Sequence, residues 1–234
     1  MGVRYVGATV QRMEDPRLVT GHGRYVDDIV IEGTLEAAFL RSPHAHAKIR
    51  SIDASRARAL PGVHDVLTQA DLVAQLGAAL DKPMAQLYPA PALKQDRTQY
   101  PLAKDEVCYV GQTVAIIVAD SRAIAEDALA LIDVDYETLP AVVDIRKALA
   151  ADAPLAHAGD SSNLAGQLRA KFGDIDAAFA QAAHVFKSDF LQHRGGCHAM
   201  ECRGVLARDD AYGDGLTVWS STQCPYLIRR ALAR

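Results

Sequence analysis

The sequence predicts a mixed α/β fold of the α+β class, and three observations support this prediction. Short apolar runs with the period of strands alternate with helix-like segments along the first 140 residues. The run TVAIIVA at 113–119 is continuous and rich in β-branched residues, as expected for a strand covered on both faces. Three further strand-like runs follow at 185–194, 201–208 and 216–222. Half of the 234 residues are hydrophobic, which is enough for a sizeable core.

Short strand-like runs separated by turn-forming residues make up the beginning of the chain. They lie at 24–31, 35–40, 47–52 and 63–67. The pair Glu32-Gly33 between the first two runs predicts a turn that joins them into a strand pair. Asp53 and Ser55 then predict the start of a short helix that ends near Leu60, because Pro61-Gly62 follows.

Two longer helices are predicted from the spacing of their apolar residues. The first runs from 70 to about 80, with Thr68 or Gln69 leading into it, and the second runs from 122 to 132 behind the capping residues Asp120 and Ser121. Residues 81–103 lie between the two helices and contain four prolines, which predicts a surface loop. An extended segment from 134 to 139 follows the second helix, so 113–139 resembles a βαβ unit.

The charge balance excludes two classes of partner. The formal net charge is -4, whereas nucleic acids and anionic membranes select a basic surface. The first twenty residues also lack an apolar run of seven or more, so we expect neither a secretory signal nor a membrane anchor. These features predict a cytoplasmic protein with no nucleic-acid or membrane partner.

The cysteines and histidines do not predict a metal site. None of the four cysteines belongs to a C-x-x-C pair, and a disulfide framework is not expected in the cytoplasm. His193, Cys197, His198 and Cys202 are close in sequence, but their spacing matches no closed tetrahedral pattern. His44 and His46 would share one face of a strand, where packing or hydrogen bonding is the more common role of a neutral imidazole.

The last quarter of the chain predicts a second region. Small and turn-forming residues in ADAPLAHAGDSSNLAG predict a linker before it. After the strand at 216–222, Pro225 suits the first turn of a helix at 226–234, and the sequence stops inside that helix. Because a sheet with one partial helix leaves an apolar face uncovered, we expect this second region to be incomplete.

Several long segments of the sequence resemble a known family. GHGRYVDDI, AAFLRSPHAHAKIRSIDASRARALPGV and VCYVGQTVAIIVADSRAIAEDALALIDVDYETLPAVVD resemble the α/β hammerhead domain of the xanthine dehydrogenase, aldehyde oxidase and aerobic carbon monoxide dehydrogenase family. HRGGCHAMECRGVLARDD and LTVWSSTQCPYLIRRALA resemble the opening of the molybdopterin-binding domain that follows it there. The resemblance implies four parts, which are an N-terminal arm at 1–17, a hammerhead domain at 18–145, a linker at 146–165 and the start of the molybdopterin-binding domain at 166–234.

The resemblance also implies a cofactor contact at the end of the last strand. Gln223 is the first candidate, and its neighbour Thr222 is a further one. Gln112, directly before the run at 113–119, is a third candidate. A neutral carboxamide offers two donors and an acceptor to an oxo ligand or a pterin edge without adding charge. From spacing alone, Gln223 would be interpreted as a residue that caps the strand end. No catalytic residue is assigned, because the family's base glutamate comes much later in the chain.

The function implied is that of the N-terminal portion of a molybdenum hydroxylase large subunit. Such an enzyme hydroxylates carbon monoxide, an aldehyde or an N-heterocycle carbon with water as the oxygen source. Its molybdenum–molybdopterin cofactor would be only partly contacted by this chain, with iron–sulfur clusters and FAD on partner subunits. The expected partners are the remaining large-subunit segment, the iron–sulfur subunit and the flavin subunit. Two alternatives stay open, a non-catalytic binding or assembly module and an unrelated small α/β enzyme.

Overall fold

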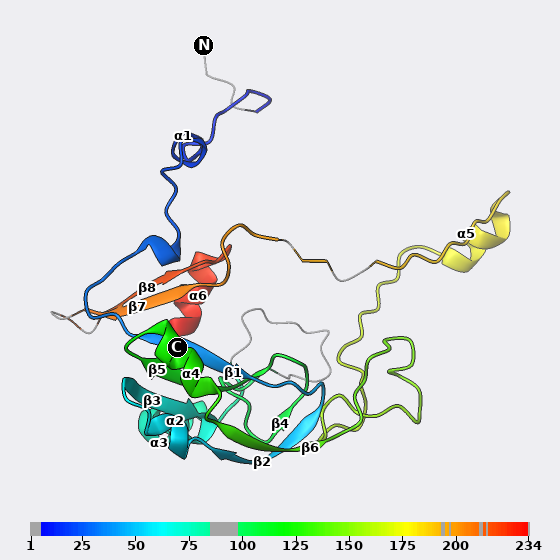
Figure 1. The fold of residues 1–234 in the computed structure, drawn as a ribbon. Helices are drawn as coiled ribbons and strands as arrows, with labels where there is room; N and C mark the ends of the chain where they lie inside the picture. Colours follow the sequence, from blue (N-terminus) through cyan, green and yellow to red (C-terminus); the bar gives the residue numbers. More distant parts are fainter. Residues whose placement is uncertain are drawn as a thin grey trace. The chain divides into compact units, whose positions relative to one another are not determined.

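The computed structural model describes most of the chain. The described residues are 6–84, 98–192, 195–196, 198–210, 213 and 215–233. They form two compact units, one from Gly33 to Lys187 and the other from Met1–Glu32 together with Ser188–Arg234 (Figure 1). The described helices include none that is long and apolar enough to cross a membrane.

Two three-stranded antiparallel sheets form the frame of the larger unit (Figure 1). The first has the order β1-β5-β3 and consists of β1 (Glu36–Arg41), β5 (Thr113–Ala119) and β3 (Val63–Thr68). The second has the order β4-β2-β6 and consists of β4 (Glu106–Val107), β2 (Ala47–Asp53) and β6 (Asp133–Thr138). Every described pairing in the two sheets is antiparallel.

The larger unit also contains short helices. They are α2 (Ser55–Arg58), α3 (Gln69–Leu76), the 3-10 helix η2 (Ala78–Leu80), α4 (Arg122–Leu129) and α5 (Ile175–Gln181). Thr68, one of the two residues predicted to lead into α3, is its N-cap, and the predicted capping role of Ser121 at α4 is confirmed. Thr68 and Asp71 form a reciprocal capping box at α3, and the Ser121 hydroxyl accepts the N–H of Ile124 at 3.4 Å at α4. Residues 145–149, after the last strand of this unit, form a series of turns.

The strand β5 is apolar from Val114 to Ala119 because both of its faces are covered. Ile117 belongs to the larger core cluster, with buried alanines of α2 and α4. Val114 belongs to a second cluster with Ala47 of β2 and Val107 of β4. The continuous β-branched run therefore reports burial on two sides, as the sequence predicts.

Two predicted strand arrangements were wrong. β5 and β6 lie in different sheets, so α4 carries the chain from one antiparallel sheet to the other and no parallel βαβ unit forms. Glu32-Gly33 does not join a strand pair either. The segment before it contains the 3-10 helix η1 (Val26–Asp28) and no strand, and β1 pairs with β5, far along the chain. The periodicity identified most of the strands correctly, but it carries no information on which strands pair.

The smaller unit is built around a β-hairpin. Its elements are α1 (Asp15–Val19), η1, β7 (Val205–Asp209), β8 (Leu216–Ser220) and α6 (Pro225–Leu232). β7 and β8 pair antiparallel, with Leu206 opposite Trp219. A strand at 185–194 was also predicted, but residues 185–192 form none, and His193 and Arg194 lie outside the described residues. The domain boundaries inferred from the resemblance stay predictions.

Candidate functional site

The junction between β8 and α6 holds the first site candidate, and the hairpin fixes where it begins. Ser221 follows β8, and its hydroxyl accepts the N–H of Gly204 at 2.8 Å. The N–H of Ser221 donates in turn to the carbonyl of Gly204 at 3.1 Å. These bonds hold the end of β8 against the start of β7. The chain therefore leaves the hairpin from a defined position.

Thr222 and Gln223 lie exposed at this junction but make different contacts. The hydroxyl of Thr222 accepts the N–H of Cys224 at 3.1 Å, so Thr222 shapes the turn into the helix. The carboxamide of Gln223 makes no hydrogen bond to another residue of the described chain. Within the described part of the chain it therefore does not cap the strand end, and its donors and its acceptor have no partner there.

The start of α6 adds a partial positive charge beside Gln223. Cys224 is the N-cap residue, and its side chain makes no capping hydrogen bond. Its carbonyl accepts the N–H groups of Leu227 and Ile228 at 3.1 and 3.2 Å. The first turn contains no acidic residue. A helix N-terminus without a carboxylate favours an anionic or hydrogen-bonding group, which fits the phosphate and pterin of the implied cofactor.

Gln112, the third candidate, has a local structural role in the larger unit. Its side-chain carbonyl accepts the N–H of Cys108 at 2.7 Å. The neighbouring Gly111 adopts a φ of +90° and donates its N–H to the carbonyl of Ser42 at 2.8 Å. Gln112 therefore fixes the turn that precedes β5. It belongs to a different unit from Gln223 and Thr222, which are neighbours in the smaller unit.

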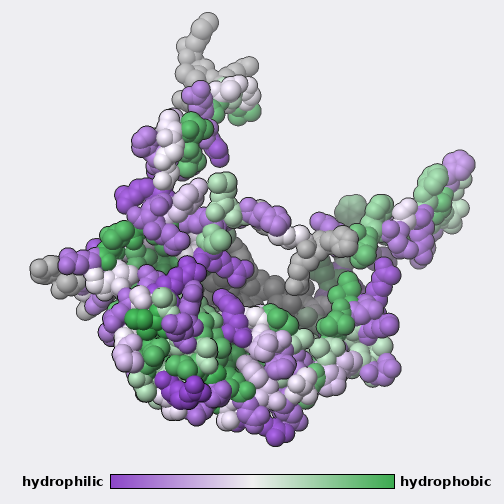
Figure 2. Space-filling view, in the orientation of Figure 1, coloured by the Kyte–Doolittle hydropathy of each residue, from purple (hydrophilic) through white to green (hydrophobic). Residues whose placement is uncertain are grey.

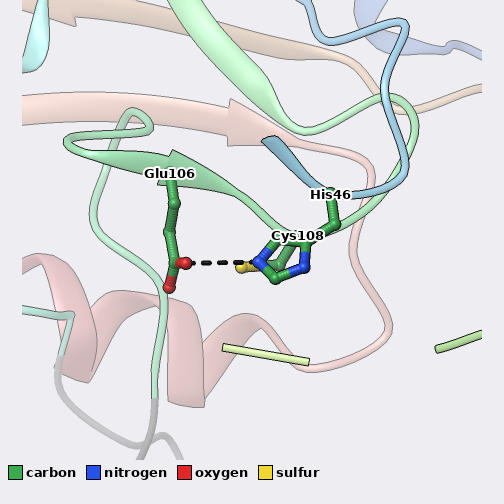
Figure 3. A group of neighbouring side chains, drawn as sticks. All are labelled: His46, Glu106 and Cys108. Atoms are coloured by element: carbon green, nitrogen blue, oxygen red, sulfur yellow. Dashed lines mark hydrogen bonds and ion pairs between the residues drawn. The ribbon is translucent and has the colours of Figure 1, made fainter. Parts of the chain in front are cut away.

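The structure brings together a group of side chains that sequence reasoning missed. His46, Glu106 and Cys108 converge, with their ligand-type atoms all within 4.8 Å of one another (Figure 3). His157 joins them, because its Nδ1 lies 3.2 Å from Cys108 Sγ and 3.5 Å from Glu106 Oε1. We call these four residues the His46 cluster. One sequence feature could have indicated part of this cluster, because Glu106 and Cys108 are two residues apart at a strand.

The carboxylate of Glu106 is held ionised within the His46 cluster. Partial burial raises its pKa. The N–H of Ala158, which donates to Oε2 at 3.0 Å, and the imidazoles of His46 and His157 lower it by more. The pKa of Glu106 therefore lies below its usual value, and the side chain presents a negative charge to both imidazoles.

The other histidines and cysteines weighed as ligands behave differently. The ring of His44 packs edge-on against Tyr136 with the ring centroids 4.9 Å apart, in agreement with the predicted packing role. Cys202 is exposed and in no disulfide. His193 and Cys197 lie outside the described residues, so the set near 193–202 stays untested.

Comparisons with known proteins match the chain in two parts. Residues 20–140 match the family described as aldehyde oxidase and xanthine dehydrogenase, a/b hammerhead domain. Residues 156–234 match the molybdopterin cofactor-binding domain.

Two curated relatives are similar over nearly the whole chain. The nicotine 6-hydroxylase large subunit of Paenarthrobacter nicotinovorans is 42% identical over 97% of this chain and 27% of the relative. The carbon monoxide dehydrogenase large chain of Afipia carboxidovorans is 40% identical over 97% of this chain and 28% of the relative. The chain thus spans little more than a quarter of the length of these relatives.

Solved structures agree with the sequence comparison. A Cu,Mo-CO dehydrogenase superposes with a TM-score of 0.80 at 38% identity, over 97% of this chain and 29% of that one. Quinoline 2-oxidoreductase from Pseudomonas putida 86 gives a TM-score of 0.76 at 38% identity, over 97% of this chain and 28% of that one. At this identity the likeness extends beyond the fold alone.

Proposed function

The chain belongs to the xanthine dehydrogenase, aldehyde oxidase and carbon monoxide dehydrogenase family of molybdopterin-binding large subunits. From this membership we propose that it contributes the N-terminal part of the active site of a molybdenum hydroxylase. It contains the hammerhead domain and the start of the molybdopterin cofactor-binding domain. The rest of the large subunit would supply the remaining active-site residues, including the catalytic base, and this chain would be inactive without it.

The observation that carries the proposal is the β8–α6 junction. The exposed Gln223 carboxamide has no partner in the described chain, and an uncapped helix N-terminus with no acid in its first turn follows it. In the proposed complex, the Gln223 amide donates to and accepts from the cofactor, and Thr222 keeps the turn in shape. The bound molybdenum–molybdopterin cofactor supplies the two-electron redox chemistry by which a carbon is hydroxylated with oxygen from water.

The proposed substrates are carbon monoxide, an aldehyde or the carbon of an N-heterocycle. The names of the relatives support this range, since they include a nicotine hydroxylase, a carbon monoxide dehydrogenase and a quinoline oxidoreductase. In all three classes the oxygen from water is added to a carbon atom of the substrate. The described residues of this chain contain no feature that selects one of them.

The proposed partners are the remaining large-subunit segment, an iron–sulfur subunit and a flavin subunit, the last two carrying iron–sulfur clusters and FAD. Relatives described as large subunits or large chains support an assembly of several chains. Exposed apolar residues along one segment of this chain support a covering partner (Figure 2). They are Leu168, Phe172, Ile175, Phe179, Val185, Phe186, Phe190 and Leu191.

The test combines this chain with the rest of its large subunit and compares two glutamine variants. We expect Gln223→Ala to lower the molybdenum content or the rate of dye reduction by about 10–100-fold, the usual cost of losing an outer contact to a metal centre. Gln75→Ala serves as the matched control, since Gln75 is an exposed amide on α3 that bonds only to Asp65 at 3.1 Å among described residues. Full molybdenum content and unchanged turnover in Gln223→Ala would contradict the role of Gln223.

The exposed apolar segment also favours a second candidate function, that of a non-catalytic assembly module. In this case the chain would hold a partner of the complex through the segment at 168–191 without contributing to the cofactor site. A pull-down of the tagged chain with the other subunits, followed by dye reduction, distinguishes the two. Tight association that survives Gln223→Ala with activity unchanged would favour the assembly module.

A further inference from the structure

The His46 cluster gathers residues from three distant parts of the chain. His46 precedes β2, Glu106 lies in β4, Cys108 follows β4, and His157 lies beyond β6. The antiparallel pairing of β2 with β4 places the first three side by side (Figure 3). The set contains one thiol, one carboxylate and two imidazoles, which are the donor types that zinc accepts in proteins.

Three distances within the cluster are close to those between ligands around one small ion. Zinc bonds of about 2.0–2.3 Å in tetrahedral geometry place neighbouring ligand atoms about 3.3–3.6 Å apart. His46 Nε2 lies 3.4 Å from Glu106 Oε2, and His157 Nδ1 lies 3.5 Å from Glu106 Oε1. Cys108 Sγ lies 3.2 Å from His157 Nδ1. Three contacts are thus already close to the required length, with the two imidazoles on different oxygens of the Glu106 carboxylate.

The hydrogen bonds of His46 prepare its second nitrogen as a ligand. Nδ1 lies 3.0 Å from the carbonyl of Pro140, which only accepts, so the proton is on Nδ1. In the neutral ring, Nε2 then directs a lone pair at the Glu106 carboxylate. With no proton on Nε2, two acceptors face each other at 3.4 Å, and a metal cation bound by both would compensate them. His46 is only 5% exposed, so bulk water does not supply the compensation.

The same geometry argues against a nucleophilic catalytic group made of Cys108, His157 and Glu106. In such a group the imidazole uses one nitrogen for the thiol and the other for the carboxylate. Here a single atom, His157 Nδ1, faces both Cys108 Sγ and Glu106 Oε1. One nitrogen that faces two ligand-type atoms is typical of coordination around a shared ion.

We propose that His46, Glu106, Cys108 and His157 bind a divalent transition-metal ion of the zinc class. Outer contacts hold the ligands in place, since Ala158 donates to Glu106 and Pro140 accepts from His46. Four protein ligands leave no open position, so the ion is structural. It fastens the segment around His157 to β2 and β4. A surface groove lined by Glu106, Cys108 and His157 gives the ion a path to the cluster.

The direct test measures metal bound by the full 234-residue chain. After incubation with zinc and removal of unbound ions, elemental analysis is expected to find about one zinc ion per chain. Cobalt in place of zinc should give the visible bands of a tetrahedral site and a sulfur-to-cobalt charge-transfer band. A chain that retains no zinc, or a cobalt spectrum without the sulfur band, would overturn the proposal.

Variants identify the residues that hold the ion. Cys108→Ser and His157→Gln should each weaken zinc binding by more than about 100-fold, since the loss of an outer contact alone costs 10–100-fold. The matched controls are Cys202→Ser, an exposed thiol outside the cluster, and His64→Gln, an exposed imidazole that pairs with Asp120. Both controls should bind zinc as the parent chain does. Equal losses in controls and cluster variants, with circular dichroism unchanged, would place the ion elsewhere.

This inference does not depend on the proposed cofactor contact. The cluster lies in the larger unit and Gln223 in the smaller one. Zinc binding is measured without molybdenum, so a negative result here leaves the proposed hydroxylase function unaffected.

Discussion

Asp71 shows how one side chain can stabilise several elements at once. Its carboxylate accepts the N–H of Thr68 at 2.9 Å, the Thr68 hydroxyl at 2.6 Å and a guanidinium N–H of Arg58 at 2.8 Å. It thereby joins the start of α3 to α2. Partial burial raises its pKa, but the bonds from Thr68 and the charge of Arg58 lower it by more, so the pKa of Asp71 lies below its usual value.

We expect Asp71→Ala to lower the free energy of unfolding by about 1 kcal/mol at pH 7, the usual cost of a lost cap. A depressed pKa contributes stability that is present above the unfolded value of about 3.9 and is lost as pH falls through the folded pKa. The difference in the free energy of unfolding between the parent chain and Asp71→Ala should therefore shrink below about pH 4. Urea unfolding at pH 7 and pH 3 measures it.

The control for Asp71 is Asp127→Ala on α4. Asp127 is exposed and makes no side-chain hydrogen bond to the described residues, so its loss should change stability by less than about 0.5 kcal/mol. A difference between parent and Asp71→Ala that stays constant across the pH range would show that the ionised carboxylate is not the stabilising form.

At the scale of elements, β5 is the strand on which both core clusters depend. Ile117 is fully buried and lies between Ala38 of β1 and Val66 of β3. We expect Ile117→Ala to lower the free energy of unfolding by about 2–5 kcal/mol, and Ile117→Val to lower it by about 0.5–1.5 kcal/mol. The reasons are the lost burial and the cavity left behind. Denaturant unfolding measures both. A cost for Ile117→Ala no larger than for Ile117→Val would contradict the assigned packing.

The elements that could be predicted are those with strong local signals. β5 has a continuous β-branched run, and α3 and α4 follow the capping residues Thr68 and Ser121. Pro225 marked the start of α6. The pairing of strands could not be predicted in this way, because β1 and β5 are more than seventy residues apart. β4 has two residues, too few to show a period.

The two candidate sites differ in what the sequence could reveal. Gln223 stands out only through the family resemblance, because a glutamine after a strand is most often a local hydrogen-bonding residue. The His46 cluster has no motif, since its three parts, His46, the pair Glu106 and Cys108, and His157, are separated by about fifty to sixty residues. The pairing of β2 with β4 brings the first two parts together. Spacing rules for metal sites apply to ligands on one short segment and therefore missed it.

At the scale of the whole molecule, exposed apolar residues determine how strongly the isolated chain associates with itself. Phe186 is 91% exposed and Phe190 is 94% exposed within the segment described above. Exposed aromatic residues grouped in one segment promote association. The double variant Phe186→Ser/Phe190→Ser should therefore reduce self-association and the binding of a hydrophobic dye. Circular dichroism should be unchanged, because neither residue is buried in a core cluster.

Light scattering and dye fluorescence on the full chain test this prediction. Val143→Ser is the control, because Val143 is an exposed apolar residue outside the segment. The control should leave both signals as in the parent chain. The same double variant should weaken association with the remaining large-subunit segment by at least about tenfold, since a buried aromatic side chain often contributes more than 1.4 kcal/mol at an interface. Unchanged self-association together with unchanged partner binding would show that the segment at 168–191 is not the surface that the partner covers.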